Sequence, residues 1–130
     1  PESDIPLLKS SATMPTALPG TSFFSNMPYA KGRTMIDHGL GLALASDYNP
    51  GSTPSGDMKF VMSLACMKMR LLPEEALNAV TINGAYAMGL SRDYGSISIG
   101  RCARLILTRP VPSLAFLPYA YTTDCISRVV

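Results

Sequence analysis

The sequence contains few of the residues that usually assemble a self-sufficient catalytic centre. Charged residues make up only 15% of the chain, tryptophan is absent and His38 is the single histidine. A catalytic metal site needs about three protein ligands, so one histidine cannot form such a site by itself. The sequence also has no phosphate-binding loop, no His-Glu-x-x-His pair and no Gly-x-Ser-x-Gly turn. The sequence thus lacks the motifs of P-loop nucleotide-binding enzymes, of His-Glu-x-x-His metalloproteases and of serine hydrolases with a Gly-x-Ser-x-Gly turn.

Basic clusters and long apolar runs are missing as well. The net charge is +2 and lysines and arginines form no long run, so we expect no nucleic-acid partner. No apolar run is long enough for a membrane span, and the polar residues 1–4 do not resemble a signal peptide. Cys66, Cys102 and Cys125 lack metal-type spacing, which is typical of reduced, buried thiols. We therefore expect a cytoplasmic protein without a membrane partner.

Hydrophobic residues make up 47% of the chain, enough for a core, and their spacing predicts alternating strands and helices. Helices are expected at 3–9, 30–38, 57–71 and 73–88. Strands are expected at 12–18, 40–47, 105–107 and 125–130, with further alternation around Ile97 and Ile99. The order predicts an α/β fold with a parallel sheet, followed by a small β unit. Two parallel strands need neighbours, so we expect the chain to be part of a larger barrel or sheet.

Several local signals set the expected boundaries. Asp4 or Ser3 is expected to cap the first helix and Asp57 to cap the helix at 57–71. Pro19 and Gly20 are expected to form a turn before a loop at 21–29. Gly39 is expected to end the helix at 30–38, and Pro73 to begin the last helix after the poor cap Leu72. Glu74 and Glu75 are expected to lie in a solvated first turn.

One loop carries the residues best suited to chemistry. Asp47 follows the apolar run at 40–46, at the end of a strand where barrel enzymes place catalytic groups. Asn49, Gly51 and Ser52 then offer an amide, an unhindered backbone N–H and a hydroxyl for a substrate carboxylate or amide. A second interpretation stays open, because Asn-Pro-Gly is a good turn sequence and a strand-end aspartate can cap a turn.

Longer blocks around this loop resemble the imidazolonepropionase family of the amidohydrolase superfamily. These blocks are Thr-Ala-Leu-Pro-Gly-Thr-Ser-Phe-Phe at 16–24, Met-Ile-Asp-His-Gly-Leu at 35–40, Ala-Leu-Ala-Ser-Asp-Tyr-Asn-Pro-Gly-Ser at 43–52, Pro-Glu-Glu-Ala-Leu at 73–77 and Thr-Ile-Asn-Gly-Ala-Tyr-Ala at 81–87. The resemblance implies the C-terminal part of a (β/α)₈ TIM barrel together with part of a small β-sandwich. Residues 1–92 would supply the last strands and helices of the barrel, and residues 93–130 part of the sandwich.

The same resemblance implies a metal-dependent hydrolase of histidine degradation. Its substrate would be 4-imidazolone-5-propanoate, opened to N-formimidoyl-L-glutamate, and its cofactor one Zn²⁺ or Fe ion. Asp47 matches a metal ligand that also accepts a proton from the attacking water. Asn49 and Gly51 match residues that hold the substrate or product carboxylate, and Ser52 matches a contact to the imidazolone ring. The full-length enzyme is expected to be a homodimer.

Some features of the sequence depart from that family. Its metal-binding histidines lie upstream and none is present here, so the chain is expected to be inactive alone. Arg104 stands where relatives usually have an aspartate, which bears on the expected sandwich rather than on chemistry. Two alternatives stay open: a non-catalytic paralogue or partner subunit, and another cyclic-amide hydrolase or deaminase of the superfamily.

Overall fold

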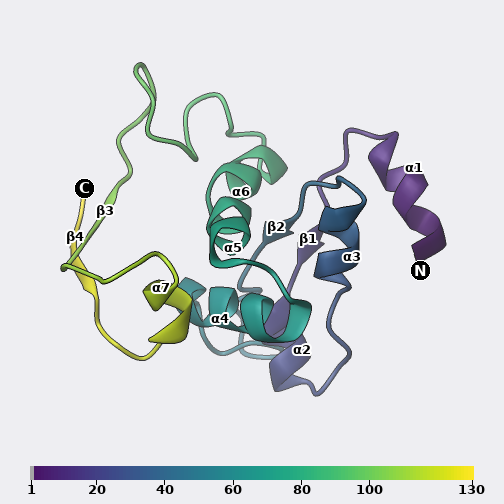
Figure 1. Ribbon diagram of the computed structural model, residues 1–130, viewed down its shortest axis with the longest axis horizontal. Helices are drawn as coiled ribbons and strands as arrows, with labels where there is room; N and C mark the ends of the chain where they lie inside the picture. Colours follow the sequence, from purple (N-terminus) through teal and green to yellow (C-terminus); the bar gives the residue numbers. More distant parts are fainter. Residues whose placement is uncertain (1) are drawn as a thin grey trace.

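The computed structural model describes residues 2–130 as helices packed around one short parallel strand pair, followed by a small antiparallel pair (Figure 1). The elements are η1 (Glu2–Asp4), α1 (Ile5–Lys9), β1 (Thr16–Ala17), α2 (Pro19–Phe24), α3 (Gly32–Asp37), β2 (Ala43–Leu44), α4 (Met58–Met69), α5 (Pro73–Val80), α6 (Ile82–Ala87), β3 (Ile106–Thr108), α7 (Phe116–Tyr119) and β4 (Ile126–Val129). No helix within residues 2–130 has the length and apolar character that crossing a membrane requires.

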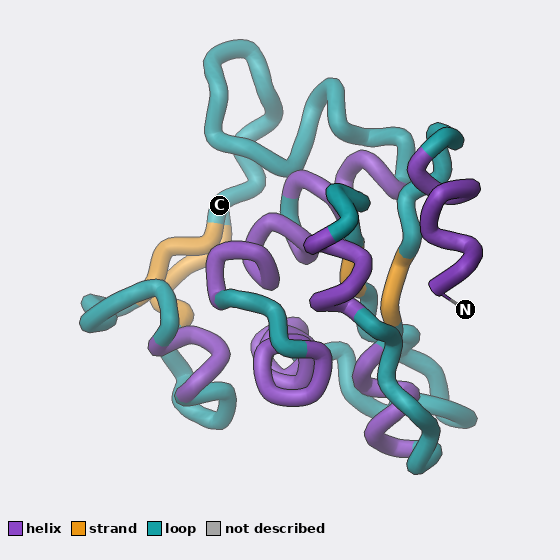
Figure 2. The backbone as a smooth tube through the Cα atoms, turned by 45° about the vertical axis from the view of Figure 1, so that its right-hand side comes forward, coloured by secondary structure: helices purple, strands orange, loops and turns teal. Residues whose placement is uncertain are grey.

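The parallel pair lies in the middle of the molecule, as the alternation of elements predicted. β1 pairs with β2, with Thr16 opposite Ala43 and Ala17 opposite Leu44. Figure 1 shows α5 and α6 on one side of this pair and α3 on the other, with α2 and α4 near the carboxyl ends of the strands. Figure 2 shows the β3–β4 pair at one edge of the molecule, away from the β1–β2 pair. The predicted α/β arrangement with a parallel sheet is therefore confirmed.

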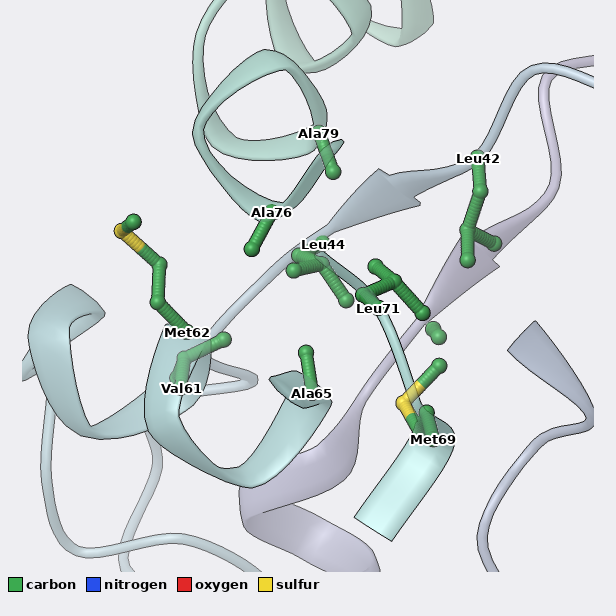
Figure 3. Close-up of a cluster of buried hydrophobic side chains, with 10 residues drawn as sticks. Leu42, Leu44, Val61, Met62, Ala65, Met69, Leu71, Ala76 and Ala79 are labelled. Atoms are coloured by element: carbon green, nitrogen blue, oxygen red, sulfur yellow. The ribbon is translucent and has the colours of Figure 1, made fainter. Parts of the chain in front are cut away.

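The core forms where β2 meets α4 and α5 (Figure 3). Leu42 and Leu44 point from the strand segment into a cluster that contains Val61 and Met62 of α4. The facing helix positions are small, with Ala65, Ala76 and Ala79 almost fully buried, so the two helices pack closely. Burial of this kind contributes roughly 25 cal/mol per Å² of apolar surface. The alanines of α5 therefore allow its close approach to α4.

Some expected helix signals hold and others do not. The Asp57 carboxylate accepts hydrogen bonds from the Lys59 and Phe60 backbone N–H groups at 2.8 and 3.3 Å, so it caps α4 as predicted. Gly39 follows α3 with a φ of +75°, which also fits its expected role. The first helix is present as predicted, but its predicted cap was wrong, because Asp4 precedes α1 without a side-chain capping bond and Ser3 donates to Asp4 instead.

Four expected segments differ from the sequence prediction. Residues 19–24 form helix α2 rather than a turn and loop, because Pro19 suits a first helical turn and Phe23 packs edge-on against Phe60 at 5.3 Å. The expected helix at 73–88 divides at Thr81, whose φ of −114° and ψ of −89° are not helical. The expected strands at 12–18 and 40–47 shorten to β1 and β2.

The C-terminal part matches the prediction only in its last strands. β3 and β4 pair antiparallel, with Ile106 opposite Val129 and an irregularity after Leu107. Ile97 and Ile99 lie outside any strand and are 88% and 107% exposed, so the alternation there did not indicate a strand. Helix α7 was not predicted. The β-sandwich and the domain boundary between residues 92 and 93 stay predictions.

Helices α3 and α5 are joined by an ion pair that the sequence did not predict. Arg33 Nη1 and Nη2 donate to Glu75 Oε2 and Oε1 at 2.8 and 3.0 Å. Glu75 Oε2 also accepts from the Leu72 backbone N–H at 2.8 Å, which compensates for the poor cap. The expectation of a fully solvated Glu75 was therefore wrong. The hydrogen bond from Arg33 holds the pKa of Glu75 below its usual value of 4.5.

This ion pair leads to a prediction about stability and pH. A carboxylate with a lowered folded-state pKa adds stability above its unfolded value, near pH 4.5 here, and loses it as the pH falls through the folded value. We expect Glu75→Gln to destabilise the chain at pH 7. Between pH 5 and about pH 3, this variant should lose less of its unfolding free energy than the unmodified chain does. Urea unfolding at several pH values measures this. Glu74→Gln, one residue away in the same helical turn, is the control, and equal behaviour of both variants would refute the prediction.

Candidate functional site

The predicted site residues lie in one compact turn that follows β2. The backbone of Asp47 has a φ of +53°, a left-handed conformation that is uncommon outside glycine and asparagine. Asn49 and Thr53 then form an isolated antiparallel bridge, with backbone N to O distances of 3.0 and 3.3 Å. Asp47, Asn49 and Ser52 are half-buried, whereas Gly51 is exposed. The structure therefore brings together the four residues that the sequence singled out.

Asn49 holds this turn together through its whole side-chain amide. Its Nδ2 donates to the Asp47 carbonyl and to Ser52 Oγ, both at 2.7 Å. Its Oδ1 accepts the Gly51 and Ser52 backbone N–H groups at 2.8 and 2.9 Å. A side-chain amide has two donor hydrogens and two acceptor lone pairs, so these bonds use its full capacity. Direct donation from Asn49 to a substrate would require one of these bonds to be exchanged.

The Asp47 carboxylate is held through one of its two oxygens. Its Oδ2 accepts hydrogen bonds from Ser52 Oγ and from Thr21 Oγ1, each at 2.8 Å. Each hydroxyl gives its single proton to Oδ2, so neither of these hydrogen bonds uses Oδ1. The carboxylate is therefore fixed on one side and open on the other, which suits an oxygen that accepts a proton or binds a cation.

Thr21 is the site residue that sequence reasoning missed. It lies in the first turn of α2, and its Oγ1 is also 3.0 Å from Oγ1 of the buried Thr53. The segment 21–29 was expected to be a loop, and Thr21 was not among the predicted site residues. The available signal was its position, because Thr21 follows β1 just as Asp47 follows β2, and the carboxyl ends of parallel strands meet at one edge.

These contacts set the charge of the site. The hydrogen bond from Thr21, followed by the one from Ser52, lowers the pKa of Asp47 below its usual value of 3.8. Both hydroxyls stabilise the charged form, because each donates to the carboxylate. Asp47 is consequently ionised at neutral pH. An ionised carboxylate with one open oxygen can bind a metal ion or take a proton from water.

The described residues supply one metal ligand and not a complete site. Within residues 2–130 no three histidine, cysteine or acidic side chains lie close enough together to bind a metal ion. Asp47 Oδ1 fits the role of a single oxygen ligand, and catalytic zinc sites use about three protein ligands. A metal at Asp47 would therefore need further ligands from elsewhere.

Other reactive side chains do not join this site. His38 lies at the end of α3, with its Nδ1 2.8 Å from the Thr34 carbonyl oxygen. The three cysteines are free thiols, as predicted. Cys125 is buried and Cys66 half-buried, but Cys102 is exposed, so the prediction of burial was wrong for Cys102.

The fold and this turn define the class of protein. A family model described as the amidohydrolase family matches residues 22–126, so the chain belongs to the amidohydrolase family. Solved structures support the same fold. The chain superimposes on a zinc-bound adenosine deaminase from Xanthomonas campestris with a TM-score of 0.88 at 20% identity, covering 100% of this chain and 33% of that one. A zinc- and atraton-bound atrazine chlorohydrolase from Arthrobacter aurescens gives a TM-score of 0.86 at 20% identity, covering 100% and 32%.

Several curated relatives of higher sequence identity are imidazolonepropionases. The chain is 55% identical over 98% of its length to the imidazolonepropionase of Christiangramia forsetii, covering 31% of that protein. It is 56% identical to the imidazolonepropionase of Flavobacterium johnsoniae, again over 98% of this chain and 31% of the relative. The imidazolonepropionase of Bacillus cytotoxicus is 44% identical over 96% of this chain and 30% of that protein. The chain thus spans about a third of the length of these relatives.

Proposed function

We propose that this chain forms the C-terminal third of an imidazolonepropionase, which opens the ring of 4-imidazolone-5-propanoate to N-formimidoyl-L-glutamate. The observation that supports this most directly is the Asp47 turn, where two hydroxyls hold Oδ2 and leave Oδ1 open at the end of a parallel strand. Strand ends of this kind carry the catalytic groups of barrel enzymes. Identity of 55% to a named imidazolonepropionase supports the particular substrate.

In the proposed enzyme Asp47 is both a metal ligand and the proton acceptor. One zinc or iron ion would supply Lewis acidity and lower the pKa of a water molecule. The chain's own contribution is to hold an ionised carboxylate at a fixed position, ready to take a proton at Oδ1 and later to release it to the leaving ring nitrogen. The hydroxyls of Thr21 and Ser52 keep that carboxylate charged before the reaction.

Substrate binding is proposed for the rest of the turn. Gly51 is exposed and Ser52 retains one acceptor lone pair after donating to Asp47 and accepting from Asn49. Ser52 is therefore placed to accept a hydrogen bond from a ring N–H. We further propose that Asn49 acts with Gly51 at the substrate carboxylate, chiefly by shaping the turn, since the Asn49 amide is already fully bonded.

The surroundings of the enzyme follow from the same proposal. We propose a homodimer in the cytoplasm, and the cytoplasmic location suits the three free thiols.

A deaminase function has support only from fold likeness, at 20% identity. A non-catalytic role would not require an ionised carboxylate with an open oxygen. Imidazolonepropionase activity is accordingly the function that the geometry favours.

A hybrid enzyme tests this proposal. In it, this chain replaces the matching segment of the Flavobacterium johnsoniae imidazolonepropionase, which is 56% identical. We expect the folded hybrid to hydrolyse 4-imidazolone-5-propanoate with a kcat within about tenfold of the parent, because the reacting groups of this segment would be equivalent. The loss of the imidazolone absorbance measures ring opening. A soluble, folded hybrid that binds metal but shows no turnover would refute the proposed function.

The 130-residue chain alone provides the complementary prediction. We expect no turnover and no stoichiometric tight metal, because residues 2–130 offer one candidate ligand at the site and useful affinity needs about three. Metal content after gel filtration and an overnight activity assay measure this, with the hybrid as the positive control. Turnover by the chain alone would contradict the assignment of the remaining ligands to other segments.

A further inference from the structure

The function proposed above uses the Thr21 hydroxyl only to keep Asp47 charged, yet the whole block Pro19-Gly20-Thr21 is built closely against the Asp47 turn. Pro19 begins α2 directly after β1, and both Pro19 and Gly20 are buried. A Cβ atom added to Gly20 would lie 3.1 Å from Thr53 Cγ2, closer than most real contacts allow. Glycine at this position thus lets the first turn of α2 approach Thr53 and brings the Thr21 hydroxyl to Asp47.

The hydrogen bonds around Asp47 have a fixed direction. An ionised carboxylate has no proton, so Thr21 must donate its single hydroxyl proton to Oδ2. Thr21 can then only accept from Thr53, which lies 3.0 Å away. On the other side the Asn49 amide donates to Ser52, and Ser52 donates to the same Oδ2. Two chains of donors therefore converge on one oxygen of Asp47.

From this geometry we propose that Thr21, oriented by Thr53, is a positioning residue that fixes the rotation of the Asp47 carboxylate and presents Oδ1 to the reacting centre. The inference rests on the proposed function, because it assigns a purpose to Oδ1. The terminal torsion of an aspartate has a broad energy profile. One anchor from Ser52, five residues after Asp47, leaves the carboxylate plane free to turn. A second anchor from Thr21, 26 residues before it, removes that freedom.

The hybrid enzyme allows a test with matched variants. Thr21→Val keeps the shape of the side chain and removes the hydroxyl, whereas Thr21→Ser keeps the hydroxyl. We expect Thr21→Val to lower kcat by about 10- to 100-fold, the usual cost of losing a partner behind a metal ligand. KM should change by less than about twofold, because Thr21 does not contact substrate. Thr21→Ser should retain most of the activity.

A distant threonine controls for the loss of a hydroxyl. Thr81 donates to the Leu77 carbonyl at 2.7 Å, between α5 and α6, and Thr81→Val should leave kcat unchanged. The proposal is overturned if Thr21→Val keeps the wild-type kcat, or if Thr21→Ser loses as much activity as Thr21→Val. The second result would show that Thr21 acts through packing.

Zinc retention gives a readout that does not depend on turnover. In competition with a chelator, the hybrid carrying Thr21→Val should bind zinc about 10- to 100-fold more weakly than the unmodified hybrid. The hybrid carrying Thr21→Ser should match the unmodified hybrid. Equal zinc affinity for all three proteins would overturn the proposal, because it would show that the Thr21 hydroxyl is not needed to place Asp47 at the metal.

Crystal structures of the 130-residue chain separate this inference from the proposed function. If the unmodified hybrid is folded but inactive, the function is refuted while the positioning role can still be decided. Rotation of the Asp47 carboxylate away from its place in the Thr21→Val chain, and its retention with Thr21→Ser, would support the role. An unchanged Asp47 in the Thr21→Val chain would overturn it.

Discussion

Replacing Asp47 with asparagine in the hybrid enzyme is expected to lower kcat by about 10³-fold, within the range for a lost proton acceptor. Asparagine has the same shape, and its carbonyl oxygen can still accept from Thr21 and Ser52 at the Oδ2 position. The NH₂ group then occupies the position of Oδ1. It carries no negative charge, accepts no proton and is a poor metal ligand, so the open side of the site loses its chemistry while the held side is preserved.

A matched variant shows whether the loss is specific to this carboxylate. Asp57 caps α4 through two backbone N–H groups, and asparagine is an equally good cap. Asp57→Asn should therefore keep the wild-type kcat and the wild-type unfolding midpoint. Steady-state kinetics with excess zinc separates a catalytic loss from weak metal binding. If kcat of Asp47→Asn returns to within tenfold of wild type under saturating zinc, Asp47 is only a metal ligand and its role as proton acceptor fails.

The turn that forms the candidate site could be predicted from the sequence because its signals are local. An apolar strand ended by Asp47 and followed by Asn-Pro-Gly-Ser predicts both a buried parallel strand and a turn of polar groups. The structure brings Asp47, Asn49 and Ser52 into one hydrogen-bonded turn, as that pattern suggested. The cap at Asp57 and the stop at Gly39 were also predictable, since each acts within a few residues.

The contacts that could not be predicted join segments far apart in the sequence. Thr21 reaches Asp47 across 26 residues, and Arg33 reaches Glu75 across 42. Asn83 belongs to a predicted helix, but its side chain donates to the Leu42 carbonyl at 2.9 Å and so ties α6 to the strand segment. Helix periodicity places such residues on a face, but only packing of the whole chain determines which residue lies opposite.

Helix α2 shows why tertiary contacts change a local prediction. Pro-Gly is a good turn signal, and six residues are too few to form a stable helix alone. The contact between Phe23 and Phe60 and the close approach of Gly20 to Thr53 supply the missing stabilisation. The same short helix places Thr21 beside Asp47. A segment that looked like a passive loop therefore carries the contact that local patterns could not predict.

Asn49→Ala is expected to have the second-largest effect on the hybrid, lowering kcat/KM by about 10²- to 10³-fold, since misplacement by about 1 Å can cost 10²-fold. The change removes four hydrogen bonds to Asp47, Gly51 and Ser52. Each is worth roughly 1 kcal/mol net, and the two backbone N–H groups left behind would have to bond to water. Both the orientation of Ser52 towards Asp47 and the shape of the Asp47 turn should be lost together.

The pattern of kinetic changes identifies what Asn49 does. If it shapes the turn, Asn49→Ala should lower kcat and raise KM together, because Ser52 then no longer holds Asp47 Oδ2. If its amide bound the substrate carboxylate directly, KM alone should rise and a substrate analogue without the carboxylate should be insensitive to the change. Asn78→Ala, at an exposed position of α5, is the control and should behave as wild type. A KM-only effect would show that the bonds within the turn are exchanged when substrate binds, and that Asn49 contacts the substrate itself.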